Sequence, residues 1–167
     1  PDRAFYNRVS DTIHLPGRAA FKTAGDYYGT ALHELAHWTG HPQRLHRETL
    51  NESYHFGDVE YAKEELRAEL ASVFLMAERN IPHNSDSNAA YLGSWLKALR
   101  DDKHEIFRAA RDAQRAADLL IALELHKSID LALAHINRPQ LDVASSIAAE
   151  VVASVSMRET SSVEIEF

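Results

Sequence analysis

The sequence contains no cysteine, no long apolar run and no dense cluster of lysine and arginine. The lack of cysteine excludes disulfide bonds and zinc sites built from thiolates, and it fits a reducing cytoplasm. The longest apolar stretch, Leu119–Leu123, is far too short to cross a bilayer, which takes about 20 residues. A net charge of −7 without a basic cluster argues against strong binding to a phosphate backbone by this chain alone. We therefore expect a cytoplasmic protein with no membrane partner.

The 167 residues suffice for one domain with a sizeable core, and a content of 45% hydrophobic and 26% charged residues is ordinary for a globular protein. The chain begins with Pro1 and not with methionine, which suggests a piece of a longer polypeptide. A further domain before this one is therefore left open.

The spacing of apolar residues predicts a mainly helical chain with a small β element at its front. The predicted elements are a strand at 11–15, helices at 23–40, 58–79, 87–99 and 103–127, weaker helices at 131–136 and 143–155, and a loop at 42–57. The fold class is α+β with helices dominant. We divide the chain into a domain at 1–125 and a helical extension with a tail at 126–167, to which we assign no function.

Helix boundaries and inward faces follow from the same patterns. Thr23 and Asp26 predict a capping box, Gly40 a helix end, and Asp58 the cap of the next helix. The residues expected to face the core are Leu66, Leu70, Val73, Phe74 and Ala77, then Tyr91, Leu92, Trp95, Leu96 and Leu99, then Ile106, Phe107, Ala110, Ala113, Ala117, Leu120 and Ile121. The many alanines of the last group indicate close helix packing.

The helix expected at 23–40 carries His33-Glu34-Leu35-Ala36-His37, a match to the HExxH pattern. Residues four apart lie about 40° from each other around a helix, so both imidazoles project from one face and can hold one ion. Glu34 lies beside that face, where it can accept a proton from a water molecule activated by the metal. We expect His33 and His37 to bind Zn²⁺ and Glu34 to be the catalytic base.

A catalytic zinc site needs a third protein ligand. The longer pattern HExxHxxGxxH fits at Gly40 but would need a histidine at position 43, where this chain has Gln43. The next helix instead offers Glu64, Glu65 and Glu69. We favour Glu65 as the third ligand and Glu69 as the carboxylate that orients a ligand histidine. Glu64 and Glu69 stay open as alternative ligands.

These residues also have simpler interpretations. Two histidines and a glutamate can share an exposed helix face by chance, and Glu65 with Glu69 can form a solvated acidic face. The helical context and the carboxylates of the next helix favour the metal site. Four loop residues could stabilise an oxyanion but are more often merely solvated: His41, His46, Tyr54 and His55. The pair Asp101-Asp102 is interpreted as a helix cap and not as a catalytic dyad.

Several longer segments resemble the metallopeptidase domain of ArdC-type antirestriction proteins. That family is related to the TraC primases of conjugative plasmids and to the metallopeptidase domains of phage polyvalent proteins. The similar segments are 11–16, 27–42, 63–72, 94–96, 101–110 and 113–118. Together they cover roughly residues 5–122, which makes the resemblance far more specific than HExxH alone.

The resemblance implies a zincin-like fold of the gluzincin type, with two histidines and one glutamate as zinc ligands. It implies a zinc metallopeptidase, which hydrolyses a peptide bond of an unknown protein or peptide by metal-activated water. The family role is to protect incoming plasmid or phage DNA from host restriction, and single-stranded DNA is expected to bind only to an N-terminal domain outside this chain. Two alternatives remain: a zinc-containing module that inhibits restriction by binding without proteolysis, and a helical interaction domain without metal.

Overall fold

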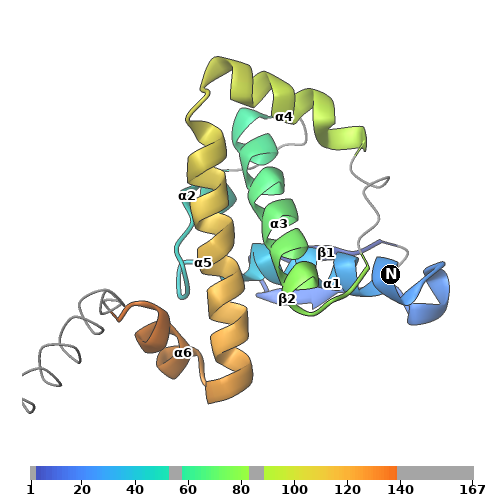
Figure 1. Ribbon diagram of the computed structural model, residues 1–167, viewed down its shortest axis with the longest axis vertical. Helices are drawn as coiled ribbons and strands as arrows, with labels where there is room; N and C mark the ends of the chain where they lie inside the picture. The colour runs from blue at the N-terminus through green and yellow to red at the C-terminus, as the bar shows by residue number, and fades with distance from the viewer. Residues whose placement is uncertain (1–2, 53–57, 83–88, 139–167) are drawn as a thin grey trace, which may run out of the picture. The chain divides into compact units, whose positions relative to one another are not determined.

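The computed structural model of the protein describes residues 3–52, 58–82 and 89–138 (Figure 1). The chain divides into two compact units, Pro1–Ile136 and Asn137–Phe167. Almost all of the second unit, including the helix predicted at 143–155, lies outside the described residues. The division at residue 125 stays a prediction.

The first unit is dominated by helices and has one small sheet, as the sequence predicted. Its elements in chain order are β1 (Phe5–Asn7), β2 (Thr12–His14), a 3-10 turn η1 (Arg18–Ala20), α1 (Ala24–Thr39), α2 (Glu48–Glu52), α3 (Val59–Glu78), α4 (Ala89–Asp101), α5 (Glu105–His126) and α6 (Ile129–Ile136). The two strands pair antiparallel, with Tyr6 opposite Ile13. No helix of the described residues is long and apolar enough to cross a membrane.

The predicted ends of α1 are confirmed. The Thr23 hydroxyl accepts the Asp26 amide at 3.0 Å, and the Thr23 amide donates to the Asp26 carboxylate at 3.1 Å, which completes the capping box. Gly40 follows the last residue of α1. The loop predicted at 42–57 is wrong over Glu48–Glu52, which forms α2. A helix of little more than one turn is too short to show a helical period.

The two longest helices, α3 and α5, run parallel and side by side, and α4 connects them across one end (Figure 1). Ion pairs mark the register, because Arg67 binds Asp112 and Arg79 binds Glu124, each 45 residues further along the chain. The face of α5 toward the core is lined by buried alanines: Ala109, Ala113, Ala116 and Ala117. Their small side chains let the helices approach closely, in agreement with the prediction.

Three residues expected in the core are exposed: Ala77, Leu96 and Phe107. Phe107 is 72% exposed because Glu105 takes the inward position at the start of α5, where Arg67 binds it. At Leu96 the preceding Trp95 is the buried residue. Ala77 stands in the last turn of α3. Periodicity thus located the helices, but it did not resolve which of two neighbouring residues faces inward.

Candidate metal centre

The predicted ligands meet where α1 packs on α3, and small residues allow that approach. Ala36 of α1 and Ala68 of α3 are fully buried in one core cluster. The Ser72 hydroxyl donates to the Gly29 carbonyl at 3.0 Å, and a Cβ atom at Gly29 would lie 3.2 Å from the Met76 sulfur. The contact has little room for larger side chains, and it brings the carboxylates of α3 within reach of the histidines of α1.

His33, His37 and Glu65 direct one ligand atom each toward a common point. The two Nε2 atoms are 3.1 Å apart. The Glu65 carboxylate lies 3.5 Å from Nε2 of His33 and 3.4 Å from Nε2 of His37. These three are the only cluster of metal-binding type among the described residues, and they come from one turn of α1 and one residue of α3.

The other nitrogen of each ring contacts a further carboxylate of α3. Nδ1 of His33 lies 3.2 Å from Glu69, and Nδ1 of His37 lies 3.1 Å from Glu64. A neutral imidazole that donates Nδ1–H has a lone pair on Nε2. When both rings donate Nδ1–H in this way, the two Nε2 lone pairs face each other and the Glu65 carboxylate, an arrangement that a bound metal ion or an added proton satisfies.

The spacing of the three atoms fits a divalent ion. Tetrahedral zinc bonds of about 2.0–2.1 Å place neighbouring ligand atoms about 3.3 Å apart. The separations of 3.1, 3.4 and 3.5 Å lie around this value. The donor set, two imidazoles and one carboxylate with each imidazole oriented by another carboxylate, is one that zinc sites use. The residues present therefore fit the metal that the sequence predicted.

Glu64 is held in place by a network that the sequence did not reveal. It is 2% exposed, and its carboxylate accepts Arg47 Nε at 3.0 Å, Arg47 Nη2 at 2.6 Å and the Thr49 hydroxyl at 2.6 Å. Arg47 also donates to the Ala36 carbonyl at 2.8 Å. Glu64 thus contacts the proposed ligand His37, and Arg47 and Thr49 contact Glu64 in turn.

Glu34 lies in the same buried face of α1 and is tied to the sheet. The backbone of Tyr6 in β1 lies close enough to its carboxylate to favour the charged form, which lowers the pKa of Glu34. The hairpin itself is fastened by Arg44, which donates to the Asp11 carboxylate, to the Tyr6 hydroxyl and to the Trp38 carbonyl. β1 therefore positions the side chain that we expect to act as base.

Burial and charge shift the protonation of these groups. Burial raises the pKa of Glu34, and this exceeds the opposite effect of the nearby histidines. Burial raises the pKa of Glu65 too, but hydrogen bonds with His33 and His37 lower it overall. Burial lowers the pKa of His37, whereas its hydrogen bonds with Glu64 and Glu65 raise it overall. The carboxylates of the centre therefore outnumber its histidines, and although Arg47 pairs with Glu64, the centre attracts positive charge.

Comparison with known proteins agrees with this geometry. Residues 1–112 match the sequence profile of a family described as zincin-like metallopeptidase. The chain belongs to this family. A relative, the DNA primase TraC of Escherichia coli, is 54% identical over 123 residues, which are 74% of this chain and 11% of TraC. The resemblance seen in the sequence is thereby confirmed.

Solved structures of the antirestriction protein ArdC of plasmid R388 have a similar fold. The metal-free structure has a TM-score of 0.61 and 48% identity, over 71% of this chain and 42% of ArdC. The structure with Mn(II) bound also has a TM-score of 0.61, with 41% identity over 83% of this chain and 46% of ArdC. The chain thus spans under half the length of ArdC and about a tenth of the length of TraC.

Of the remaining residues singled out in the sequence, those that the structure describes lie outside the cluster of His33, His37 and Glu65. Nδ1 of His41 accepts the Gln43 amide at 3.2 Å, and Tyr54 and His55 lie outside the described residues. Asp101 is the last residue of α4, and the Asp102 carboxylate accepts the His104 amide at 2.9 Å just before α5. The pair therefore lies at a helix boundary, but the N-cap residue of α5 is His104, so the interpretation of the pair as the cap is wrong.

Proposed function

We propose that this chain is the metallopeptidase domain of an antirestriction protein, with His33, His37 and Glu65 as metal ligands and Glu34 as general base. The observation that carries the proposal is the convergence of three lone-pair-bearing atoms beside a buried carboxylate. The antirestriction role is supported by 48% identity to ArdC. Since the chain covers under half of ArdC, protection of plasmid or phage DNA in the cytoplasm is proposed for the protein that contains this domain.

Zinc is the metal that we propose, because two histidines and one glutamate form a known ligand set of catalytic zinc. Such an ion would act as a Lewis acid, which lowers the pKa of a water molecule and polarises a peptide carbonyl group. The Mn(II) in the related ArdC structure makes manganese the competitor that metal analysis has to distinguish.

The residues of the chain supply the remaining chemistry. Glu34 would take a proton from the attacking water and pass it to the leaving amine. Burial raises the pKa of Glu34 toward neutral pH. A carboxylate with such a pKa is a more effective base, and its protonated form can donate the proton to the leaving amine. Glu64 and Glu69 would hold the rings of His37 and His33 with Nδ1–H toward the carboxylate, which keeps Nε2 free for the metal.

The decisive experiment compares Glu34→Gln with the wild type, after purification without an affinity tag. Cleavage of an unfolded protein, followed by mass spectrometry, should fall by about 10²–10⁴-fold, while zinc content stays near one ion per chain. Glu78→Gln, an exposed glutamate at the end of α3, is the matched control and should keep full activity. Cleavage that persists in Glu34→Gln would rule out the proposed base.

The same variant separates the proposal from the binding module without proteolysis. Transfer of unmodified plasmid DNA into a restricting host should drop with Glu34→Gln as much as with a variant lacking His33. A Glu34→Gln protein that still protects DNA, while the His33 variant does not, would favour a zinc-dependent interaction module.

A further inference from the structure

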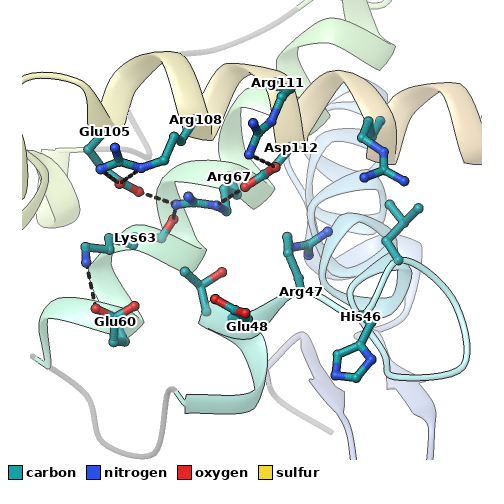
Figure 2. A pocket seen from close by; sticks show the side chains of 13 residues that line it. His46, Arg47, Glu48, Glu60, Lys63, Arg67, Glu105, Arg108, Arg111 and Asp112 are labelled. Atoms are coloured by element: carbon teal, nitrogen blue, oxygen red, sulfur yellow. Dashed lines mark hydrogen bonds and ion pairs between the residues drawn. The ribbon is translucent and has the colours of Figure 1, made fainter.

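A cavity of about 420 Å³ lies between α2, α3 and α5, and Figure 2 shows the side chains that line it. Arg67, which lines it, is two residues from Glu65 and so points about 200° away from it around the helix. The volume of the cavity lies in the range of small-ligand pockets. The cavity is therefore a separate feature that the proposed peptidase chemistry does not use.

Cationic side chains dominate the wall, although the chain as a whole carries a net charge of −7. The six basic residues that line the cavity are Arg47, Lys63, Arg67, Arg108, Arg111 and Arg115. The four acidic residues that line it are Glu48, Glu60, Glu105 and Asp112. The basic residues come from three segments of the chain, so the fold assembles a cluster that is absent from the linear sequence.

Three of the four wall carboxylates are already bound by neighbouring cations, as the dashed lines in Figure 2 show. Glu105 accepts Arg67 and Arg108, each at 2.6 Å, and Glu60 accepts Lys63 at 2.6 Å. Asp112 accepts Arg67 at 2.8 Å. The wall of the cavity therefore contains a layer of paired charges, in which Glu60, Glu105 and Asp112 are partly neutralised.

Arg111 and Arg115 stand at the rim of this layer. Arg111 is 69% exposed, and its contact with Asp112 is long, at 3.4 Å, since Arg67 holds the other oxygen of that carboxylate. Arg115 follows four residues later on α5, so the two side chains share a face of the helix about 6 Å apart. Two guanidinium groups at this spacing can hold one polyvalent anion between them.

We propose that this cavity binds a phosphate group, carried by a nucleotide-sized molecule or by a nucleic-acid strand, through Arg111 and Arg115. Each guanidinium can donate a planar pair of N–H groups, and the Asp112 carboxylate beside Arg111 is already bound by Arg67. A phosphate presents three or four oxygens and up to two charges, which matches both arginines at once. The wall lysine and arginines add favourable long-range attraction.

The variants that test the site must leave the metal centre untouched. Arg47 and Thr49 also line the cavity, but they hold Glu64 and are excluded for that reason. Arg111→Gln/Arg115→Gln removes two charges from the rim. Arg79→Gln/Arg100→Gln removes two charges from exposed positions outside the cavity and is the matched control.

The experiment titrates the full 167-residue chain, with and without added zinc, at low ionic strength. The probes are thymidine 5′-monophosphate, thymidine and a short oligothymidylate, followed by calorimetry and by NMR of the arginine side chains. We expect both phosphate-bearing probes to bind and thymidine not to bind. The double variant at the rim should weaken binding about tenfold or more, and added salt should weaken it further. The control should bind like the wild type.

Two comparisons decide the outcome. Oligothymidylate that binds far more tightly than the mononucleotide identifies a nucleic-acid strand as the ligand, whereas equal affinities identify a free phosphorylated molecule; both support the site. Thymidine that binds as well as its monophosphate, equal binding by the rim variant and the wild type, or no binding of any phosphate probe would overturn the proposal. No peptide cleavage enters the measurement, so it succeeds or fails independently of the proposed peptidase.

Discussion

Arg47→Met tests whether the buried network behind His37 tunes the metal centre. Arg47 is buried and makes two hydrogen bonds to Glu64, one to the Ala36 carbonyl and one to the Thr39 hydroxyl. Methionine keeps much of the volume but none of these bonds. Glu64 is left with Thr49 and His37 as partners.

The expected loss of stability in Arg47→Met follows from the burial of both Arg47 and Glu64. Removing one member of a buried ion pair costs about 3–5 kcal/mol, because the other charge stays buried without compensation. Burial raises the pKa of Glu64, and the charge of Arg47 is the largest influence that lowers it again, so the variant favours a protonated Glu64. A neutral carboxyl accepts the Nδ1–H of His37 more weakly, and loss of such orientation typically costs 10–100-fold in metal affinity.

The assay pairs urea unfolding of the metal-free chain with zinc competition against a chromophoric chelator. Arg67→Met is the matched control, since Arg67 is also a buried arginine and forms an ion pair with the buried Glu105. It should lose a similar free energy of unfolding and keep its zinc affinity. Should Arg47→Met not fold, Thr49→Val removes a single bond to Glu64, at about 1–2 kcal/mol, and should weaken zinc binding in the same direction.

The refuting result is equal zinc affinity in Arg47→Met, Arg67→Met and the wild type, at temperatures where all three are folded. Arg47 would then contribute only to packing, and the hydrogen bond between Glu64 and His37 would have no influence on the metal.

Two further predictions concern neighbouring parts of the structure. Gly40→Ala would place a Cβ atom 2.7 Å from Nη2 of Arg47 and 3.0 Å from Leu50, and Arg47 is fixed by its hydrogen bonds. We therefore expect the free energy of unfolding in urea to fall by about 1–3 kcal/mol and zinc binding to weaken. A variant with the stability and zinc affinity of the wild type would contradict this. Hydrogen bonding from Arg44 lowers the pKa of Asp11 from 3.8 to about 2, so Asp11 stabilises the fold above pH 4 and this contribution is lost as the pH falls through about 2. Because Asp11 is about a third exposed, Asp11→Asn should cost only about 1 kcal/mol at neutral pH, and the difference from the wild type should vanish near pH 2; a difference independent of pH would refute the pairing.

The sequence predicted those parts of the centre that depend on local spacing. His33 and His37 are one turn apart, and the helix that carries them is defined by Thr23 at its start and Gly40 at its end. The choice of α3 for the third ligand followed from Gln43, which removes the histidine of the longer pattern. That Glu65 lies at the two Nε2 atoms agrees with this choice, and the roles of ligand and base stay predictions until metal and activity are measured.

The parts that depend on distant contacts were not predictable. Arg47 and Thr49 lie 17 and 15 residues before Glu64, in a segment without periodicity, and only the packing of α2 on α3 brings them to it. The cationic cavity was missed for the same reason, because its residues are spread from position 47 to position 115. α3 contacts four other helices, so a single inward stripe could not describe its burial.

Three glutamates lie close together on α3, and each contacts a basic side chain from another segment. Glu65 and Glu69 are four residues apart, and carboxylates at this spacing repel each other on an isolated helix. In the fold, Glu64 binds Arg47, Glu69 contacts His33, and Glu65 faces the two Nε2 atoms. In the described structure Glu65 contacts the Nε2 atoms of both rings, where a metal ion would bind. A zinc ion between the histidines would balance its charge, so zinc should raise the stability of this chain, and Glu65→Gln should weaken zinc binding more than Glu69→Gln does.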